Sequence, residues 1–131
     1  SWVQTVDRIK IVNKLNQYRH SKNPLNICIQ VNISEENTKS GIGLNDVKEF
    51  AKIISNLKNL KLRGVMAIPS KTNENQNLVS QYRLLKKLYE DLKISYSSVD
   101  TLSIGMSNDY LLAIENGANL VRIGTKIFGA R

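Results

Sequence analysis

Five segments of the chain have the apolar character of β-strands, and one of them alternates cleanly between apolar and polar residues. The clearest is residues 25–33 (LNICIQVNI), in which every odd position is Leu, Ile or Val and every even position is Asn, Cys or Gln. Such a strand has one apolar face and one mixed face. The pattern predicts strands at residues 2–6, 25–33, 60–68, 99–106 and 119–124.

The segments between these strands carry apolar residues at the three-and-four spacing of amphipathic helices. This spacing predicts helices at residues 9–18, 47–59, 78–92 and 111–114. Asp7 and Ser107 precede two of these helices and have side chains suited to capping a helix N-terminus, and Gly117 is suited to ending the last one. Strands and helices therefore alternate along the whole chain.

This order, with its short connections, predicts an α/β fold with a parallel sheet. An open doubly wound sheet and a (β/α)8 barrel both satisfy it. Polar residues at inward strand positions favour the barrel, because a doubly wound sheet is covered by helices on both faces. Gln30 and Asn32 in the second strand and Arg122 in the fifth are such residues. Five strands cannot close an eight-stranded barrel, so we expect residues 1–131 to be the C-terminal part of a single TIM-type barrel domain, with about its last five strands.

Composition and charge narrow the classes of function only a little. The chain has 19 Lys and Arg against 11 Asp and Glu, a formal charge of +8, and such an excess suits nucleic acid, an anionic membrane or a phosphorylated ligand. The basic residues are scattered over predicted helices, which makes nucleic acid and membranes poor candidates. No apolar stretch approaches the length of a membrane span. The single cysteine, Cys28, allows no internal disulfide and suits a reducing, cytoplasmic location.

Two loops at predicted strand ends contain the residues that phosphate sites use. Phosphate binding needs convergent backbone N–H groups, glycine where the chain approaches the ligand, and often a hydroxyl. Gly105, Met106 and Ser107 end the fourth strand, and Gly124 and Thr125 end the fifth. The loops after the last two strands are the usual phosphate cradle of such barrels. We therefore predict a phosphate site here, although each glycine alone also fits an ordinary turn and Ser107 an ordinary helix cap.

Other side chains give weaker signals. Arg122 points into the same interior by alternation, and an arginine beside a phosphate loop favours a ligand contact over a salt bridge. Lys39, in the loop after the second strand, faces either an anionic ligand or solvent. Met66 is predicted to pack in the core, and His20, the only histidine, to be exposed. No Ser-His-Asp set and no cluster of metal ligands can be assembled.

Four motifs, in order along nearly the whole chain, are similar to those of one known family. They are VNISEENTKSGIG, LRGVMAIP, DTLSIGMSND and VRIGTKIFGAR. With them the chain resembles the pyridoxal phosphate homeostasis protein family, also called the YggS/PROSC family. Members are single barrels similar to the N-terminal domain of alanine racemase and are longer than this chain. The resemblance places Ser1, which is not a methionine, just before the fourth barrel strand, so we expect sequence to precede it.

By this resemblance the chain binds pyridoxal 5'-phosphate (PLP). The residues implied to hold its phosphate are Met106, Ser107, Gly124 and Thr125. Arg122 is implied to approach the pyridine nitrogen; because an arginine does not easily give up a proton, the ring stays a poor electron sink, which suits storage better than catalysis. Lys39 is implied to contact the cofactor secondarily. The lysine that forms the family's aldimine lies on the first barrel strand, outside this chain.

Three residues depart from the family's pattern. Asn108 stands where an acidic residue is common, Tyr110 replaces a frequent methionine, and Lys126 takes a position that is usually small. Asn108 is expected to weaken an interaction at the start of the following helix, and Lys126 to add charge near the phosphate.

The resemblance implies a protein that binds PLP and helps to maintain its cytoplasmic supply without catalysis of its own. Its implied partners are the cofactor and PLP-dependent apo-enzymes, and the full-length protein is expected to be a monomer. Two other classes stay open: a racemase-like or decarboxylase-like barrel enzyme that uses the same site and, more weakly, a nucleic-acid-binding domain. Because its sheet edges are open, the chain expressed alone is expected to aggregate or to pack loosely.

Overall fold

The computed structural model describes residues 1–34, 36–70 and 75–130 and contains one parallel sheet with the strand order β1-β2-β3-β4-β5. The strands are β1 (Trp2–Val6), β2 (Leu25–Val31), β3 (Leu60–Ala67), β4 (Thr101–Met106) and β5 (Leu120–Arg122). The helices are α1 (Ile9–Tyr18), α2 (Val47–Ser55), α3 (Asn75–Ser95), α4 (Tyr110–Glu115) and α5 (Thr125–Phe128), with the 3-10 turn η1 (Leu44–Asp46) before α2.

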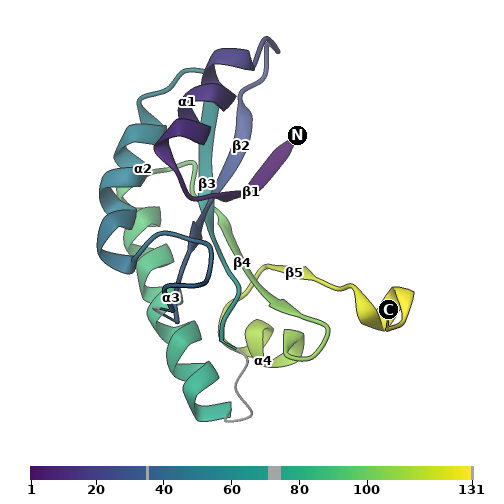
Figure 1. Cartoon of the computed structure of the whole chain (residues 1–131). Helices are drawn as coiled ribbons and strands as arrows, with labels where there is room; N and C mark the ends of the chain where they lie inside the picture. Colours follow the sequence, from purple (N-terminus) through teal and green to yellow (C-terminus); the bar gives the residue numbers. More distant parts are fainter. Residues whose placement is uncertain (35, 71–74, 131) are drawn as a thin grey trace.

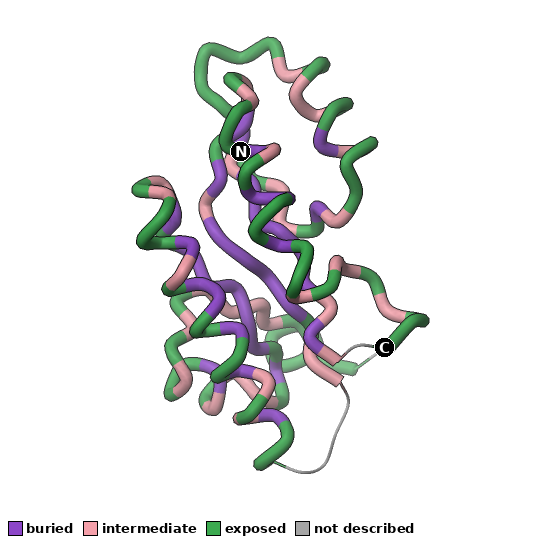
Figure 2. The backbone as a smooth tube through the Cα atoms, turned by 90° about the vertical axis from the view of Figure 1, so that its left-hand side faces the viewer, coloured by how far each residue is buried: buried purple, intermediate pink, exposed green. Residues whose placement is uncertain are grey.

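Three helices cover one face of the sheet and build the apolar core there. α1, α2 and α3 lie along the same side of the strands (Figure 1). The apolar faces of β2 and β4 are turned to these helices: Ile27, Ile29 and Leu102 are fully buried within the core cluster. Figure 2 shows the buried stretches running along the strands and the inner sides of the helices. Burial of each such side chain stabilises the fold by about 2 kcal/mol.

The opposite face of the sheet is concave and carries polar side chains. The Ser103 hydroxyl of β4 donates a hydrogen bond to Gln4 Oε1 of β1 at 2.8 Å. In a flat sheet the backbones of these two strands would lie roughly 14 Å apart, which is farther than the two side chains reach. The contact therefore requires the sheet to curl, with its helices outside, into a half-barrel. This curvature favours the barrel over the open doubly wound sheet.

The predicted order of elements is confirmed, with differences where elements begin. The predicted cap at Asp7 is wrong: Arg8 holds the N-cap position of α1 without a side-chain hydrogen bond. The Asp7 carboxylate instead accepts a hydrogen bond from the Gly41 N–H at 3.1 Å, because the loop after β2 folds against the end of β1. α3 begins at Asn75, earlier than predicted. α5 was not predicted because four residues are too few to show helical spacing, and the residues 71–74 before α3 lie outside the described ranges.

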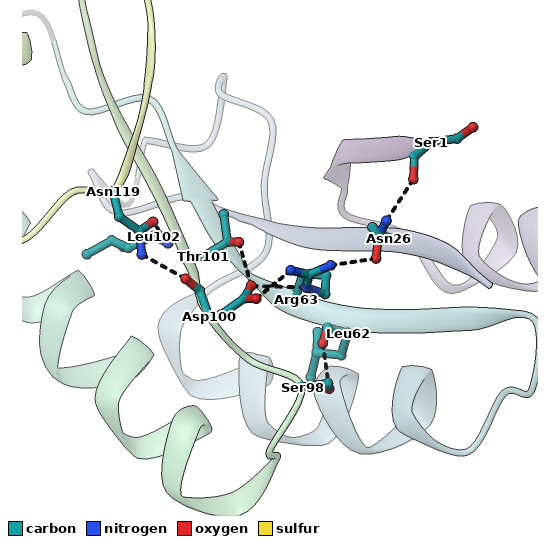
Figure 3. A network of polar contacts seen from close by, with 9 residues as sticks. All are labelled: Ser1, Asn26, Leu62, Arg63, Ser98, Asp100, Thr101, Leu102 and Asn119. Atoms are coloured by element: carbon teal, nitrogen blue, oxygen red, sulfur yellow. Dashed lines mark hydrogen bonds and ion pairs between the residues drawn. The ribbon is translucent and has the colours of Figure 1, made fainter. Parts of the chain in front are cut away.

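A polar network joins the strands at their amino-terminal ends (Figure 3). Arg63 of β3 forms a two-point ion pair with Asp100, through Nε to Oδ1 at 3.0 Å and through Nη2 to Oδ2. Its Nη1 donates to Asn26 Oδ1 of β2 at 2.9 Å, and its guanidinium lies 4.6 Å from the centre of the Trp2 ring in β1. Asn119, just before β5, donates to the Asp100 carbonyl oxygen at 2.7 Å. In barrels of this class, this end of the strands serves stability.

We expect the Asp100→Asn variant of the full-length protein to lose stability in a pH-dependent way. The hydrogen bond from Arg63 lowers the pKa of Asp100 below its usual value. The charged carboxylate therefore stabilises the fold, and this contribution is lost as the pH falls through the lowered pKa. Because the Asp100 side chain is 52% exposed, solvent screening limits the effect to about 1 kcal/mol.

Thermal unfolding followed from about pH 7 to about pH 2 measures this difference. The unmodified protein is expected to be the more stable of the two at neutral pH, and the two curves are expected to converge at the acidic end. The matched control is Glu115→Gln, which removes an exposed carboxylate of α4 and should change little. A stability gap of equal size at both ends of the pH range would contradict the assignment.

Candidate functional site

The loops after β4 and β5 meet at the carboxyl ends of the strands through one hydroxyl. Ser107 is buried, and its Oγ accepts hydrogen bonds from the Gly124 N–H at 3.1 Å and the Lys126 N–H at 3.3 Å. The predicted capping role of Ser107 is therefore wrong, because its oxygen faces the neighbouring loop and Asp109 occupies the N-cap position of α4. The backbone N–H groups of the second loop thus point at an oxygen supplied by the first.

Asp109 holds the first loop in this shape. Its Oδ1 accepts a hydrogen bond from the Met106 N–H at 2.8 Å, and its Oδ2 accepts one from the hydroxyl of Tyr82, a buried residue of α3. Burial, with the Asp109 hydrogen bond, raises the pKa of the Tyr82 hydroxyl. Tyr82 therefore stays a neutral donor that orients the carboxylate, and the covering helix fixes the end of β4.

The two glycines of the predicted site have different roles. Gly105 has a φ of 95°, and a Cβ there would lie 2.6 Å from the Cβ of Ala113, so this glycine lets α4 pack closely on β4. Gly124 has no described atom within 4 Å of the position a Cβ would take. Gly105 therefore serves packing, whereas Gly124 borders open space at the rim of the sheet.

Arg122 lies on the concave face, as alternation predicts. Its position in β5 pairs with Met106 of β4. Its Nη1 donates to the Ser103 carbonyl oxygen at 3.0 Å and to Ser103 Oγ at 2.7 Å, and its Nη2 donates to the Ala67 carbonyl oxygen at 3.0 Å. Burial lowers the pKa of Arg122, with nearby Asp109 acting in the opposite direction, but a guanidinium remains a cation. The site therefore holds one fixed, half-buried positive charge beside the two loops.

Two apolar residues fill the concave face next to this charge. Met66 is 2% exposed and Cys28 is fully buried, and both lie outside the main core cluster that packs under the helices. The predicted packing role of Met66 is confirmed. Burial raises the pKa of Cys28 to about 12, so the thiol stays neutral and packs as a small apolar group.

The structure does not bring Lys39 into contact with these loops. Its Nζ lies 3.4 Å from the Glu36 carboxylate, and its side chain is partly exposed. The loop is organised by Asn32, whose Nδ2 donates to the Glu36 carbonyl oxygen at 2.8 Å. Asn32 therefore shapes its own loop, and a ligand contact by Lys39 stays a prediction. His20 is exposed, as predicted.

The described ranges contain neither a metal-binding cluster nor a helix that could span a membrane. In residues 1–34, 36–70 and 75–130, no group of three or more His, Cys, Asp or Glu side chains is arranged to hold a metal ion. Over the same residues, every helix is too short or too polar to cross a membrane. The arrangement at the carboxyl ends of β4 and β5 is the candidate site: it places two hydroxyls and a half-buried cation around the open space beside Gly124, which together suit an anionic ligand.

Comparison with known proteins identifies the fold family. A model of the alanine racemase N-terminal domain matches residues 1–131. The chain belongs to this family. Pyridoxal phosphate homeostasis protein from Pasteurella multocida is 48% identical over 99% of this chain and 57% of its own length. The protein of the same name from Escherichia coli is 46% identical over 99% of this chain and 56% of its own length.

Solved structures with the alanine racemase N-terminal fold agree. An unknown protein from Bifidobacterium adolescentis superposes with a TM-score of 0.90 at 27% identity, over 97% of this chain and 52% of its own. PipY from Synechococcus elongatus, with PLP bound, superposes with a TM-score of 0.85 at 24% identity, over 98% of this chain and 60% of its own. The resemblance drawn from the four motifs and the half-barrel fold are both confirmed. This chain spans about half the length of the curated relatives it matches.

Two departures from the family's pattern contact each other. Lys126 Nζ lies 4.5 Å from the centre of the Tyr110 ring and 3.4 Å from its hydroxyl oxygen. A cation above an aromatic face is attracted to it by about 0.5 to 1 kcal/mol at an exposed site. This pair adds a second link between the loop after β5 and α4. Asn108, the third departure, is exposed, and the neighbouring Asp109 supplies the carboxylate that orders the loop.

Sequence reasoning missed four residues of this alanine racemase-like site. Asp109 and Tyr82 shape the first loop, while Gln4 and Ser103 lie on the concave face with Arg122. The period-two pattern of β4 already places Ser103 at an inward position, so part of the signal was available. It does not place Gln4, because Val3 and Val6 both pack on the helix-covered core and the register of β1 shifts between them. The contact between Gln4 and Ser103 was not available, because it depends on how strongly the sheet curls.

Proposed function

We propose that this chain forms the phosphate-binding and ring-nitrogen-binding part of a longer PLP-binding barrel. In the full-length protein, the cofactor phosphate would be held by the loops after β4 and β5, and Arg122 would face the pyridine nitrogen. The protein would bind PLP and help to maintain its supply without catalysing a reaction. A cytoplasmic location, a monomeric state and delivery to PLP-dependent apo-enzymes belong to the same proposal.

The observation that carries this proposal is the contact of Ser107 Oγ with the N–H groups of Gly124 and Lys126. These two contacts fill the acceptor capacity of the serine oxygen and leave its O–H hydrogen to donate to an oxygen of a phosphate. Within the described residues, the Thr125 hydroxyl makes no hydrogen bond and is available to a ligand. These residues fit the phosphate of the cofactor, and Gly124 leaves open space for it. Met106 borders this space, but its N–H donates to Asp109.

Arg122 favours binding over reactions that need the ring as a strong electron sink. When bound, PLP supplies a reactive aldehyde on a ring that withdraws electrons most strongly when its nitrogen is protonated. Arg122 donates hydrogen bonds but gives up no proton. Its guanidinium would therefore orient the ring while leaving the nitrogen unprotonated, and the ring would be held without being activated.

The names of the relatives point the same way. Both curated relatives described above are called pyridoxal phosphate homeostasis protein, and PipY was solved with PLP bound. Because the chain spans about half of their length, the lysine that fixes the aldehyde is expected outside it. The two parts of the barrel would then divide the cofactor between them, with the phosphate and ring nitrogen here and the aldehyde in the other part.

Absorbance titration of the full-length protein with PLP tests the proposal. The expected result is an absorbance band of the bound cofactor that borohydride reduction abolishes, together with a stable PLP–lysine adduct located by mass spectrometry. No band and no adduct would exclude the proposal. The catalytic alternative is tested separately with amino acids that carry deuterium at the α-carbon: retention of the label is expected, whereas its release would favour a racemase-like or decarboxylase-like enzyme.

A Gly124→Ala variant separates ligand binding from folding. A Cβ at this position meets no described atom within 4 Å and the backbone has a negative φ, so thermal unfolding should change by less than about 0.5 kcal/mol. The methyl group would nevertheless enter the space proposed for the phosphate, and PLP affinity is expected to fall about tenfold. Unchanged affinity in a stably folded variant would show that the phosphate does not lie against Gly124.

A further inference from the structure

A chain of hydrogen bonds crosses the concave face from the first strand to the last. Gln4 of β1 accepts a hydrogen bond from the Ser103 hydroxyl of β4 at 2.8 Å, and Ser103 Oγ accepts one from Arg122 Nη1 of β5 at 2.7 Å. Ser103 is fully buried. The guanidinium of the proposed cofactor site is therefore connected, through one buried hydroxyl, to a side chain at the opposite edge of the sheet.

The count of hydrogens fixes the direction of this chain. A serine hydroxyl has one hydrogen, and a guanidinium has donors only, so the Ser103 hydrogen cannot point to Arg122. It needs an acceptor, and the Gln4 carboxamide oxygen supplies it. This requirement also fixes which end of the Gln4 amide faces Ser103. With its hydrogen committed to Gln4, Ser103 presents lone pairs to Arg122.

These contacts determine which N–H groups of Arg122 stay unbonded and where they point. Nη1 is bound to Ser103, and one Nη2–H donates to the Ala67 carbonyl oxygen at 3.0 Å. In the part of the chain that the structure describes, the Nε–H and the second Nη2–H make no hydrogen bond. A planar guanidinium fixed at both terminal nitrogens presents its free donors in one direction only.

We propose that Gln4 and Ser103 are positioning residues that hold the Arg122 guanidinium so that a free N–H faces the ring nitrogen of the bound cofactor. This inference rests on the proposed function and adds the residues that determine ring recognition. Gln4 suits the role because its side-chain oxygen is an acceptor: it orders Ser103 and leaves the free donors of Arg122 for the ligand. Loss of the Gln4 acceptor leaves the buried Ser103 hydroxyl without a partner and the guanidinium with a weaker anchor.

The test compares two ligands in the full-length protein: PLP and its deaza analogue, in which a C–H group replaces the ring nitrogen. Gln4→Met keeps the length of the side chain but removes the acceptor, and Ser103→Ala removes the hydroxyl. Each variant is expected to bind PLP about tenfold more weakly and to bind the deaza analogue as the unmodified protein does. The absorbance maximum of bound PLP is expected to shift, because the contact to the ring nitrogen changes.

Two control variants complete the design. Gln4→Glu retains an acceptor at the same distance and is expected to restore the preference for PLP. Thr5→Val changes an exposed neighbour in β1 and should leave both affinities unchanged. Equal losses for the two ligands, or no loss in either variant, would overturn the inference. Failure of the unmodified protein to bind PLP would instead refute the proposed function.

Discussion

The Gly64→Ala variant of the full-length protein is expected to lose about 4 kcal/mol of folding free energy, a large share of the stability of an ordinary domain. Gly64 has a φ of 154°, which L side chains rarely adopt, and a Cβ there would lie 1.7 Å from the Thr101 carbonyl oxygen of the neighbouring strand. Because the obstacle is backbone, no side-chain rotation relieves it. β3 and β4 would have to separate where the Arg63–Asp100 network joins them.

Thermal unfolding and the yield of soluble protein measure this effect. Gly43→Ala is the matched control, because a Cβ there meets only the Asp46 carboxylate at an ordinary 3.4 Å and the backbone has a φ of −64°. The control is expected to unfold within about 0.5 kcal/mol of the unmodified protein. A Gly64→Ala protein as stable as this control would mean that β3 and β4 do not approach each other as described.

The Arg122→Met variant is expected to lose both affinity and stability. Its guanidinium is the one charged group proposed to face the ring, and a hydrogen bond to a charged group contributes roughly 1.5 to 3 kcal/mol, so PLP affinity should fall between about tenfold and about 100-fold. The substitution also removes the donors to the Ser103 and Ala67 carbonyl oxygens. Loss of these bonds should cost a further 1 to 3 kcal/mol of folding free energy, roughly.

Arg122→Lys separates charge from geometry. A lysine keeps the positive charge but cannot contact Ser103 and Ala67 as a planar fork. We expect it to recover part of the PLP affinity and little of the stability, as measured by equilibrium titration and thermal unfolding. An Arg122→Met protein that binds PLP as tightly as the unmodified protein would exclude Arg122 from the site.

Local sequence patterns predicted the strands and helices of this fold well, because each element depends mainly on residues that are close together in the sequence. The alternation over residues 25–33 specifies a strand and its two faces, and the same period places Arg122 on the inward face of β5. The sequence predicted the ends of the helices and strands less well. Asp7 is a good capping residue in isolation, yet its carboxylate bonds to Gly41, more than thirty residues away. A local sequence pattern cannot show that the Asp7 carboxylate bonds to Gly41 instead of capping α1.

The candidate site could be located from the sequence, but the hydrogen bonds between its residues could not be predicted. Met106, Ser107, Gly124 and Thr125 follow from strand-end position and residue type. The role of Ser107 depended on where the loop after β5 lies relative to the loop after β4, which is a property of the assembled sheet. The contact between Gln4 and Ser103 joins residues 99 positions apart and exists only because the sheet curls.

The central claim is that two neighbouring loops form a cradle for the phosphate of PLP. The most direct measurement is the affinity of the full-length protein for PLP and for pyridoxal, which lacks the phosphate, each with the unmodified protein and with Ser107→Ala. The account predicts that the unmodified protein binds PLP at least about 100-fold more tightly than pyridoxal, since a phosphate accepts several charge-assisted hydrogen bonds. It also predicts that the Ser107→Ala substitution lowers this ratio of affinities, because it weakens the binding of PLP but not the binding of pyridoxal. Equal affinities of the unmodified protein for the two ligands would contradict it.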